Sequence, residues 1–340
     1  MTAPTRPAPG GDLRSRRRSL LLRALRDPLA APAVLALALI AVLAGRPWLV
    51  DRFDVAGVAT WTTVFVAIVV QALPFLALGV VLSAVLTVYV PARWITRALP
   101  RHPVGAVCAA GVSGAVLPGC ECASVPLAGG LLRQGVPQAA ALAFLLAAPA
   151  INPIVMVATA VAFPGRPEMV LGRFVASLGA AIVVALLWAR FAPAGMLRLP
   201  APVAETGSRA ERFRASTEHD LLHAGGWLVV GAAVAATVNV VIPAEVVDAV
   251  ASEPWLAVLA LAVLAVLVAI CSEADAFVAA SFSQFSPTAQ LAFMVVGPMV
   301  DVKLVAMQAG WFGRRFALRF APLTFVVALG AAAVVGTLLL

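Results

Sequence analysis

Charge is scarce in this 340-residue sequence, and so are the residues that build most catalytic and metal sites. Only 12% of the residues are charged, and the chain has one tyrosine, three histidines and four cysteines. Soluble domains carry about 25% charged residues, so a water-soluble fold is excluded. No glycine-rich phosphate-binding loop of the Walker type occurs in the sequence. We therefore expect that the chain itself does not hydrolyse ATP and that it uses no cofactor.

Apolar residues fill the sequence instead. They make up 62% of the chain, and the mean hydropathy is +1.01. Runs of roughly 20 apolar residues, long enough to span a bilayer, recur along the whole length. This pattern predicts an all-α polytopic membrane protein with about eight to nine apolar segments. The segments are 28–50, 57–90, 104–132, 137–163, 168–190, 221–243, 255–283, 288–311 and 318–340.

The formal net charge of +8 comes mostly from arginines that flank the apolar segments. Such a distribution is typical of a membrane topology signal and argues against nucleic-acid binding. Residues 1–27 are rich in proline and arginine and are predicted to form a disordered cytoplasmic tail. Residues 28–50 are predicted to be the first transmembrane helix. The N-terminus is therefore expected on the cytoplasmic side of a bacterial plasma membrane, with the lipid bilayer as the first partner of the chain.

The second half of the chain repeats the first. The run ALAF at 141–144 corresponds to QLAF at 290–293, and Asn152 corresponds to Asp301, both at an offset of 149 residues (141 to 290, 152 to 301). The order and spacing of these matches indicate an internal duplication. The predicted units are a first permease repeat at 57–193, a cytoplasmic linker at 194–220 and a second permease repeat at 221–340.

The two repeats are predicted to be inverted relative to each other. If 104–132 and 255–283 each enter the membrane and return as hairpins, the basic loops fall inside and the acidic loop 245–253 falls outside, as the positive-inside rule favours. The hairpin tips would be 118–122 and 271–275. If every segment crossed instead, the acidic loop would be cytoplasmic. Inverted repeats with broken or re-entrant helices are a common plan of secondary transporters, whose substrate sites lie at the repeat interface.

Three of the four cysteines belong to the predicted hairpin tips. Cys120 and Cys122 flank Glu121, and Cys271 lies at the corresponding place in the second half. As thiolates, the three sulfurs could chelate a soft cation or trivalent arsenic if the tips meet. The alternative is that these small side chains pack in a crowded helix crossing. Cys108 lies outside the motif and is interpreted as a packing residue.

Charged and polar residues within apolar segments are the second group of candidates. The acids are Glu121, Glu273, Asp275 and Asp301, the base is Lys303, and Asn152 is the first-half counterpart of Asp301. Burying such groups in a membrane is costly, which favours a role in substrate passage or ion coupling over structural pairing. Asp301 and Lys303 are two residues apart, so they can face each other only where the helix is unwound after Pro298.

Several motifs resemble those of a predicted-permease family that includes ArsP. They are GCEC at 119–122, VPLAGGL at 125–131, GVP at 135–137, ALAFL at 141–145, APAINP at 148–153, CSEADAF at 271–277 and GPMVDVKL at 297–304. The resemblance extends over residues 57–325 and implies a permease fold and role. ArsP members are implicated in the efflux of trivalent organoarsenicals, whereas the APAINP run is similar to the broader permease branch.

These features predict an integral membrane permease, a secondary transporter and not an enzyme, that exports a metal, a metalloid or another thiophilic small solute. The substrate would bind at the midplane, between the CEC and CSEAD motifs. The expected partners are this small inorganic or organometalloid substrate, a second copy of the chain or an accessory membrane subunit, and no nucleic acid. Two other functions stay open, namely a membrane thiol oxidoreductase and a structural subunit of a metal-handling complex.

Overall fold

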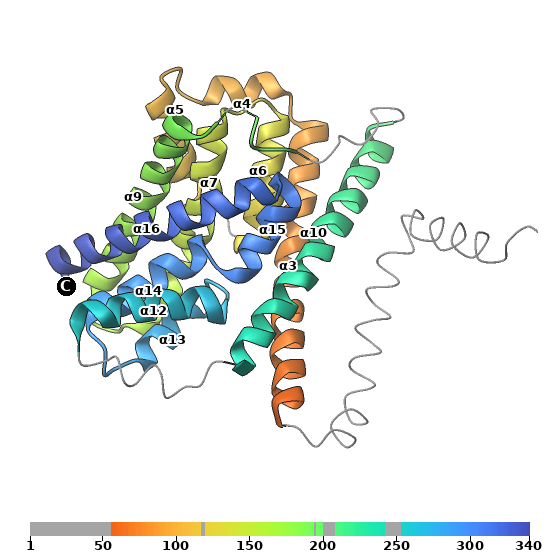
Figure 1. Cartoon of the computed structure of the whole chain (residues 1–340). Helices are drawn as coiled ribbons and strands as arrows, with labels where there is room; N and C mark the ends of the chain where they lie inside the picture. Colours follow the sequence, from red (N-terminus) through yellow and green to blue (C-terminus); the bar gives the residue numbers. More distant parts are fainter. Residues whose placement is uncertain (1–55, 117–119, 194, 200–207, 242–252) are drawn as a thin grey trace, which may run out of the picture. The chain divides into compact units, whose positions relative to one another are not determined.

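The computed structural model describes residues 56–116, 120–193, 195–199, 208–241 and 253–340 (Figure 1). The predicted tail at 1–27, the predicted first transmembrane helix at 28–50 and the acidic loop at 245–253 except for Glu253 lie outside these ranges. Every regular element within the described ranges is a helix, as expected for a chain whose backbone groups must be satisfied inside a bilayer.

The helices of the first half, residues 56–193, are α3 (Ala56–Tyr89), α4 (Ala92–Ala98), α5 (Pro103–Ser113), α6 (Glu121–Arg133), α7 (Gln138–Ile151), α8 (Pro153–Ala162) and α9 (Pro167–Phe191). Those of the second half, residues 208–340, are α10 (Arg209–Val241), α12 (Pro254–Val268), α13 (Asp275–Ser281), α14 (Pro287–Met299), α15 (Val302–Phe312) and α16 (Arg314–Leu339).

Six stretches of the described chain are long and apolar enough to cross a membrane. They are Gly57–Tyr89, Gln138–Ala162, Pro167–Phe191, Arg209–Val238, Pro287–Phe312 and Arg314–Leu339. The predicted fold class, an all-α polytopic membrane protein, is thereby confirmed. Residues 209–220, part of the predicted linker 194–220, form the first turns of α10, and Pro74 lies inside α3.

Neither of the predicted hairpin segments forms a continuous helix. In the first, α5 ends at Ser113 and α6 begins at Glu121; in the second, α12 ends at Val268 and α13 begins at Asp275. The end of α12 is marked by Ala269, whose φ of 52° is the only positive value of a non-glycine residue within the described part of the chain. A left-handed residue commonly terminates a helix in this way.

Two of the membrane-crossing stretches are also broken, each at a polar residue. Asn152 ends α7 and caps α8, because its side-chain oxygen accepts a hydrogen bond from the Val155 amide at 3.0 Å. Asp301 caps α15 in the same way, accepting from the Leu304 amide at 2.5 Å. Asparagine and aspartate are preferred at this position because they satisfy a backbone donor that the helix leaves free.

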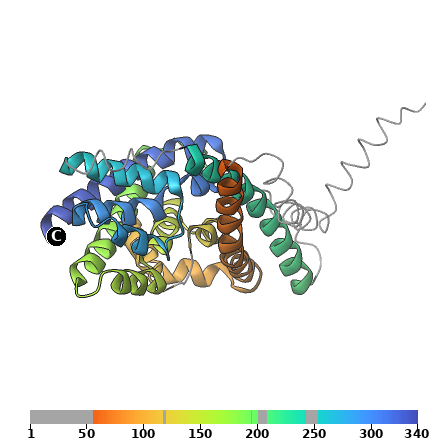
Figure 2. The ribbon, with the colours of Figure 1, turned by 90° about the horizontal axis from the view of Figure 1, so that it is seen from below.

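The breaks recur at the offset found in the sequence. Helices α7 and α14 begin at Gln138 and Pro287, and α8 and α15 begin at Pro153 and Val302, so both pairs are 149 residues apart. Helices at equivalent places in the two halves also pack together, namely α3 with α10, α7 with α14 and α9 with α16. Figures 1 and 2 show α3 and α10 side by side. Other contacts between the halves join α6 with α15, α8 with α13 and α9 with α14.

The core lies around α7 and α14, which are buried over almost their whole length. The surrounding long helices bury one side only. Large apolar side chains such as Leu318 and Phe191, each 72% exposed, and Val326, 66% exposed, lie on the outer surface. Apolar outer surfaces are what a lipid environment requires, so α7 and α14 are enclosed by protein while α3, α9 and α16 face lipid.

Candidate functional site

In each of the two interrupted segments, 104–132 and 255–283, the second helix begins with a buried acid. Glu121 is the first residue of α6, and Asp275 is the first residue of α13. Their exposed fractions are 0% and 2%. A carboxylate is favoured at this position because the helix N-terminus carries a partial positive charge. Since one helix end cannot neutralise a buried carboxylate, each acid also needs a cation nearby.

The cation for Glu121 comes from the second half. Lys303 on α15 donates from Nζ to Glu121 Oε1 at 2.5 Å, and Ser272 Oγ donates to Glu121 Oε2 at 3.3 Å. Lys303 Nζ also lies 3.4 Å from the carbonyl oxygen of Ala269 and 3.9 Å from Asp301 Oδ2. The lysine and the two acids are fully enclosed. This ion pair joins the start of α6 to the second half of the chain.

The cation for Asp275 comes from the first half. Arg173 on α9 donates from its two terminal nitrogens to Asp275 Oδ1 at 2.8 Å and Oδ2 at 2.7 Å, a bidentate arrangement. The same guanidinium donates to Thr159 Oγ1 at 3.0 Å and to the Ser272 carbonyl at 3.4 Å. Arg173 has an exposed fraction of 0%. Bidentate, charge-assisted bonds of this type are among the strongest that proteins form.

The two ion pairs cross between the halves. Glu121 belongs to the first half and Lys303 to the second, whereas Asp275 belongs to the second and Arg173 to the first. Ser272 links the pairs, because its hydroxyl contacts Glu121 and its carbonyl contacts Arg173. We call these five residues the charged centre.

The three motif cysteines lie beside the charged centre. Cys120, Cys122 and Cys271 are all buried, and the Cys120 side chain lies next to those of Cys122 and Cys271. The sulfur of Cys271 lies 4.0 Å from Lys303 Nζ. Cys108, on α5, is only half-buried. Among the residues that the structure describes, no group of three or more histidine, cysteine or acidic side chains could hold a metal ion.

The remaining predicted residues lie around this arrangement in different ways. Asn152 bonds within its own helix break, where its amide nitrogen donates to the Ala148 carbonyl at 3.1 Å. Asp301 caps α15 with one carboxylate oxygen and faces Lys303 with the other, which forms no hydrogen bond within the described part of the chain. The Glu273 carboxylate is buried, and neither of its oxygens has a hydrogen-bond partner among the described residues.

Two features of the site are not among the sequence-predicted residues. One is Arg173, which could have been identified as a charged residue inside the apolar segment 168–190. The other is Arg133 at the end of α6, which forms a bidentate pair with Asp220 of α10 at 2.9 and 3.1 Å. The Arg133 guanidinium also lies 5.6 Å from the ring centroid of Trp311 on α15. Thus both ends of α6 form ion pairs with the second half, Glu121 with Lys303 and Arg133 with Asp220.

Several membrane-crossing helices around enclosed ion pairs and helix breaks define a class of protein. Charged groups are tolerated inside a bilayer where they pair with one another, and broken helices where protein encloses them. Both features are typical of transport proteins, whose binding sites are built at such breaks. The chain is thus a multi-pass membrane protein of the permease class.

Comparison with known proteins identifies the family. The chain belongs to a family of predicted permeases, whose model matches residues 58–337. It is 32% identical over 273 residues to the UPF0718 protein YcgR of Bacillus subtilis (strain 168), covering 78% of this chain and 92% of that protein. It is 29% identical over 284 residues to a putative two-component membrane permease complex subunit of Streptococcus mutans serotype c (strain ATCC 700610 / UA159), covering 81% and 94%. No solved structure matches the chain.

Proposed function

We propose that this membrane permease is a secondary transporter that exports a thiophilic small solute, a metal or metalloid species, across the bacterial plasma membrane. The observation that carries the proposal is that the two interrupted segments, 104–132 and 255–283, meet at one place. Cys120 of the first half lies next to Cys271 of the second, and Lys303 lies against both Glu121 and Cys271. Thiol sulfur is a ligand for soft cations, and a carboxylate supplies the compensating charge.

The proposed binding step is an exchange of the positive charge that neutralises Glu121. Glu121 is neutralised by Lys303. A solute cation bound at Glu121 would take over the role of Lys303 and release its ammonium group toward Asp301, 3.9 Å away. Any thiol that binds the same cation as a thiolate would give up its proton. The buried charge then stays compensated in both states, which a low-dielectric site requires. Glu273, whose carboxylate has no hydrogen-bond partner among the described residues, is the candidate for carrying a coupled proton.

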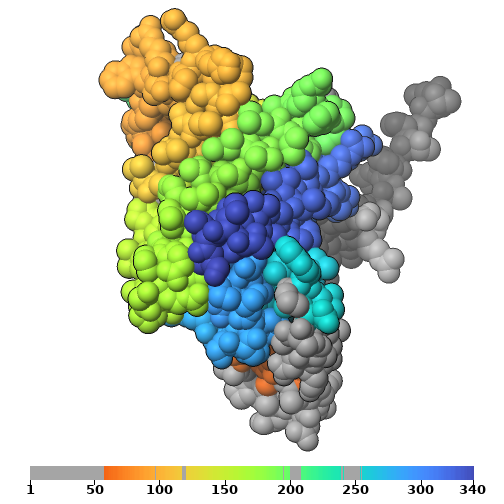
Figure 3. All heavy atoms as spheres, turned by 90° about the vertical axis from the view of Figure 1, so that its left-hand side faces the viewer, coloured from red at the N-terminus to blue at the C-terminus, as the bar shows by residue number. Residues whose placement is uncertain are grey.

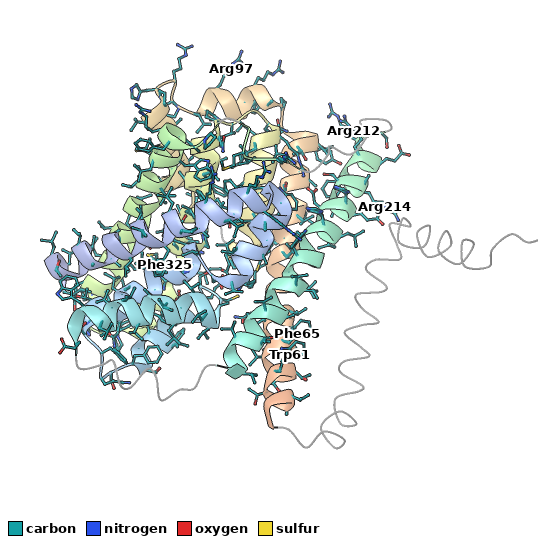
Figure 4. All side chains as sticks on the ribbon, viewed as in Figure 1. Trp61, Phe65, Arg97, Arg212, Arg214 and Phe325 are labelled. Carbon is teal, nitrogen blue, oxygen red and sulfur yellow. The ribbon has the colours of Figure 1, made fainter. Side chains whose placement is uncertain are left out.

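The proposed transport cycle uses two inverted repeats, 57–193 and 221–340. Support comes from the constant offset of the helix breaks and from the pairing of α3 with α10, α7 with α14 and α9 with α16. Figure 4 shows Arg97 and Arg212 toward one end of the described helices and Trp61 toward the other. We assign the end with the arginines to the cytoplasm by the positive-inside rule. The same proposal places Asp248, which is not among the described residues, on the outer side of the membrane.

The Streptococcus mutans relative is named as a subunit of a two-component permease complex. By analogy we propose that this chain also works with a second membrane subunit. Co-purification of a second membrane protein with the native chain would support this. Transport in proteoliposomes that does not increase when the co-purified protein is added to the chain would argue against it.

Transport by the purified chain in proteoliposomes tests the central proposal. A panel of soft metals and metalloids would be offered with and without a pH gradient, together with a hard cation as reference. Replacing Cys120 or Cys122 by serine should weaken the apparent affinity for the thiophilic solute about 10–100-fold, the range seen when groups that tune a metal ligand are removed. Cys108→Ser is the matched control, because it removes a thiol from α5 outside the hairpin motif.

The outcomes separate the alternatives. Loss of transport in the Cys120 and Cys122 variants but not in the Cys108 variant supports the proposed site. Equal transport by a Cys120→Ser/Cys122→Ser double variant and the unmodified chain would show that the sulfurs only pack. Absence of transport of any solute, together with solute-independent thiol oxidation, would favour the membrane thiol oxidoreductase.

A further inference from the structure

A cavity of about 540 Å³ lies between the segment that follows α9 and the start of α16. Its described lining residues include none of the charged centre. In Figure 3 the green segment that follows α9 lies beside the blue segment that begins α16. The volume falls within the range of roughly 300–1,000 Å³ that is usual for ligand sites.

The charge of this cavity is one-sided. Arg198, Arg314, Arg315 and Arg319 line it, and the other described lining residues are uncharged. Within the described part of the chain none of the four guanidinium groups forms an ion pair, whereas Arg133, Arg166 and Arg173 all do. Four like charges around one hollow repel one another and attract an anion.

The backbone holds these arginines around one hollow. The Arg198 amide donates to the Phe312 carbonyl at 3.0 Å, which fixes the segment after α9 against the end of α15. Gly313 then adopts a φ of 99° and turns the chain into α16, whose first two residues are Arg314 and Arg315. Arg319 follows on α16 and also lines the cavity.

The ends of two candidate membrane spans, which adjoin the cavity, indicate the source of the anion. Pro167–Phe191 and Arg314–Leu339 are both candidate membrane spans, and the cavity lies where the first ends and the second begins. Because the ends of membrane spans reach the headgroup region, the cavity is expected at the level of the lipid headgroups. Phe191 and Leu318, each 72% exposed, provide apolar surface next to it. Charge for a headgroup and apolar surface for acyl chains are therefore adjacent.

We propose that the cavity formed by Arg198, Arg314, Arg315 and Arg319 binds the phosphate headgroup of an anionic phospholipid. Guanidinium groups match phosphate oxygens in bidentate geometry, and basic pockets between transmembrane helices are suited to anionic headgroups. The bound lipid would join α9 of the first half to α16 of the second at the membrane surface.

Lipid binding to the purified full chain tests this proposal. After removal of native lipid, the chain would be titrated with phosphatidylglycerol and, separately, with phosphatidylcholine, and bound lipid counted by native mass spectrometry. The test variant is Arg198→Gln/Arg319→Gln. The matched control is Arg93→Gln/Arg97→Gln, which removes the same charge from two exposed arginines outside the cavity.

The unmodified chain should prefer phosphatidylglycerol. The test variant should bind it about 25-fold more weakly, since one arginine near the membrane surface contributes roughly five-fold. The single variant Arg319→Gln, expected to lose about five-fold, serves if the double variant does not fold.

Three results would overturn the proposal. The first is equal binding of the two lipids by the unmodified chain. The second is an equal loss in the test and control variants, which would indicate general surface charge. The third is binding of soluble glycerol phosphate as tightly as phosphatidylglycerol, which would indicate a free phosphate site.

Discussion

Removing Arg173 should destabilise the protein more than removing any exposed arginine. The guanidinium donates two bonds of 2.7 and 2.8 Å to Asp275 and one of 3.0 Å to Thr159, and its exposed fraction is 0%. In Arg173→Met the Asp275 carboxylate stays buried without its cation. Breaking one side of a buried pair costs about 3–5 kcal/mol, because the remaining charge is uncompensated. We therefore expect a loss of this size in the free energy of unfolding.

The double variant Arg173→Met/Asp275→Leu separates charge from packing. It removes both charges and replaces them with apolar side chains, a change that is often neutral or stabilising by about 1–4 kcal/mol. We expect it to recover most of the stability lost in Arg173→Met. Unfolding would be followed by circular dichroism as sodium dodecyl sulfate is added to protein in a mild detergent.

The matched control is the pair of Arg166 and Glu168. Its 3.2 Å contact joins side chains that are 40% and 38% exposed. Solvent screens such a pair, so Arg166→Met should leave the unfolding transition unchanged. The reasoning would be refuted if Arg173→Met behaved like Arg166→Met, or if the double variant were destabilised by the sum of its two single changes.

Two further predictions concern packing and topology. Gly129→Ala should destabilise the protein by about 1–3 kcal/mol in the same unfolding assay, because an added methyl group would overlap the Trp311 indole. Gly179→Ala, where the methyl meets no described atom within 4 Å, should be neutral or stabilising. In intact cells, a membrane-impermeant thiol reagent should label a cysteine placed at Asp248 but not one placed at Arg212 in a chain without its native cysteines. The reverse result would contradict the inverted-repeat topology.

The helix breaks could be predicted from the sequence because their causes are local. Asn152 and Asp301 are polar residues near proline within apolar runs, and both cap the helix that follows them. Such signals depend on residues within one or two turns of each other, so a single sequence contains them. The interruption before Glu121 was also predicted, as the tip of a hairpin at 118–122 that the positive-inside rule favours.

The partners of the buried charges could not be predicted in the same way. Glu121 and Lys303 are 182 residues apart, and Arg173 and Asp275 are 102 residues apart. A sequence pattern shows that a buried charge needs a counterion, but it does not show which of several candidates comes near. The sequence predicted four candidate acids as one group without assigning their counterions, whereas the structure pairs Glu121 and Asp275 with separate cations.

The crossed pairing limits how the two halves can move. Each half has one acid and one cation of the charged centre, and each acid finds its cation in the other half. A complete separation of the halves would leave four buried groups unpaired, at several kcal/mol for each. Any transport movement must therefore open one pair while the other stays closed, or exchange one cation for another. Because Lys303 has a second acid within 3.9 Å and Arg173 is bound in a bidentate geometry, the Glu121–Lys303 pair is the one that can be exchanged. A solute cation that replaces Lys303 at Glu121 would satisfy this requirement, and the Arg173–Asp275 pair would remain as the fixed contact between the halves.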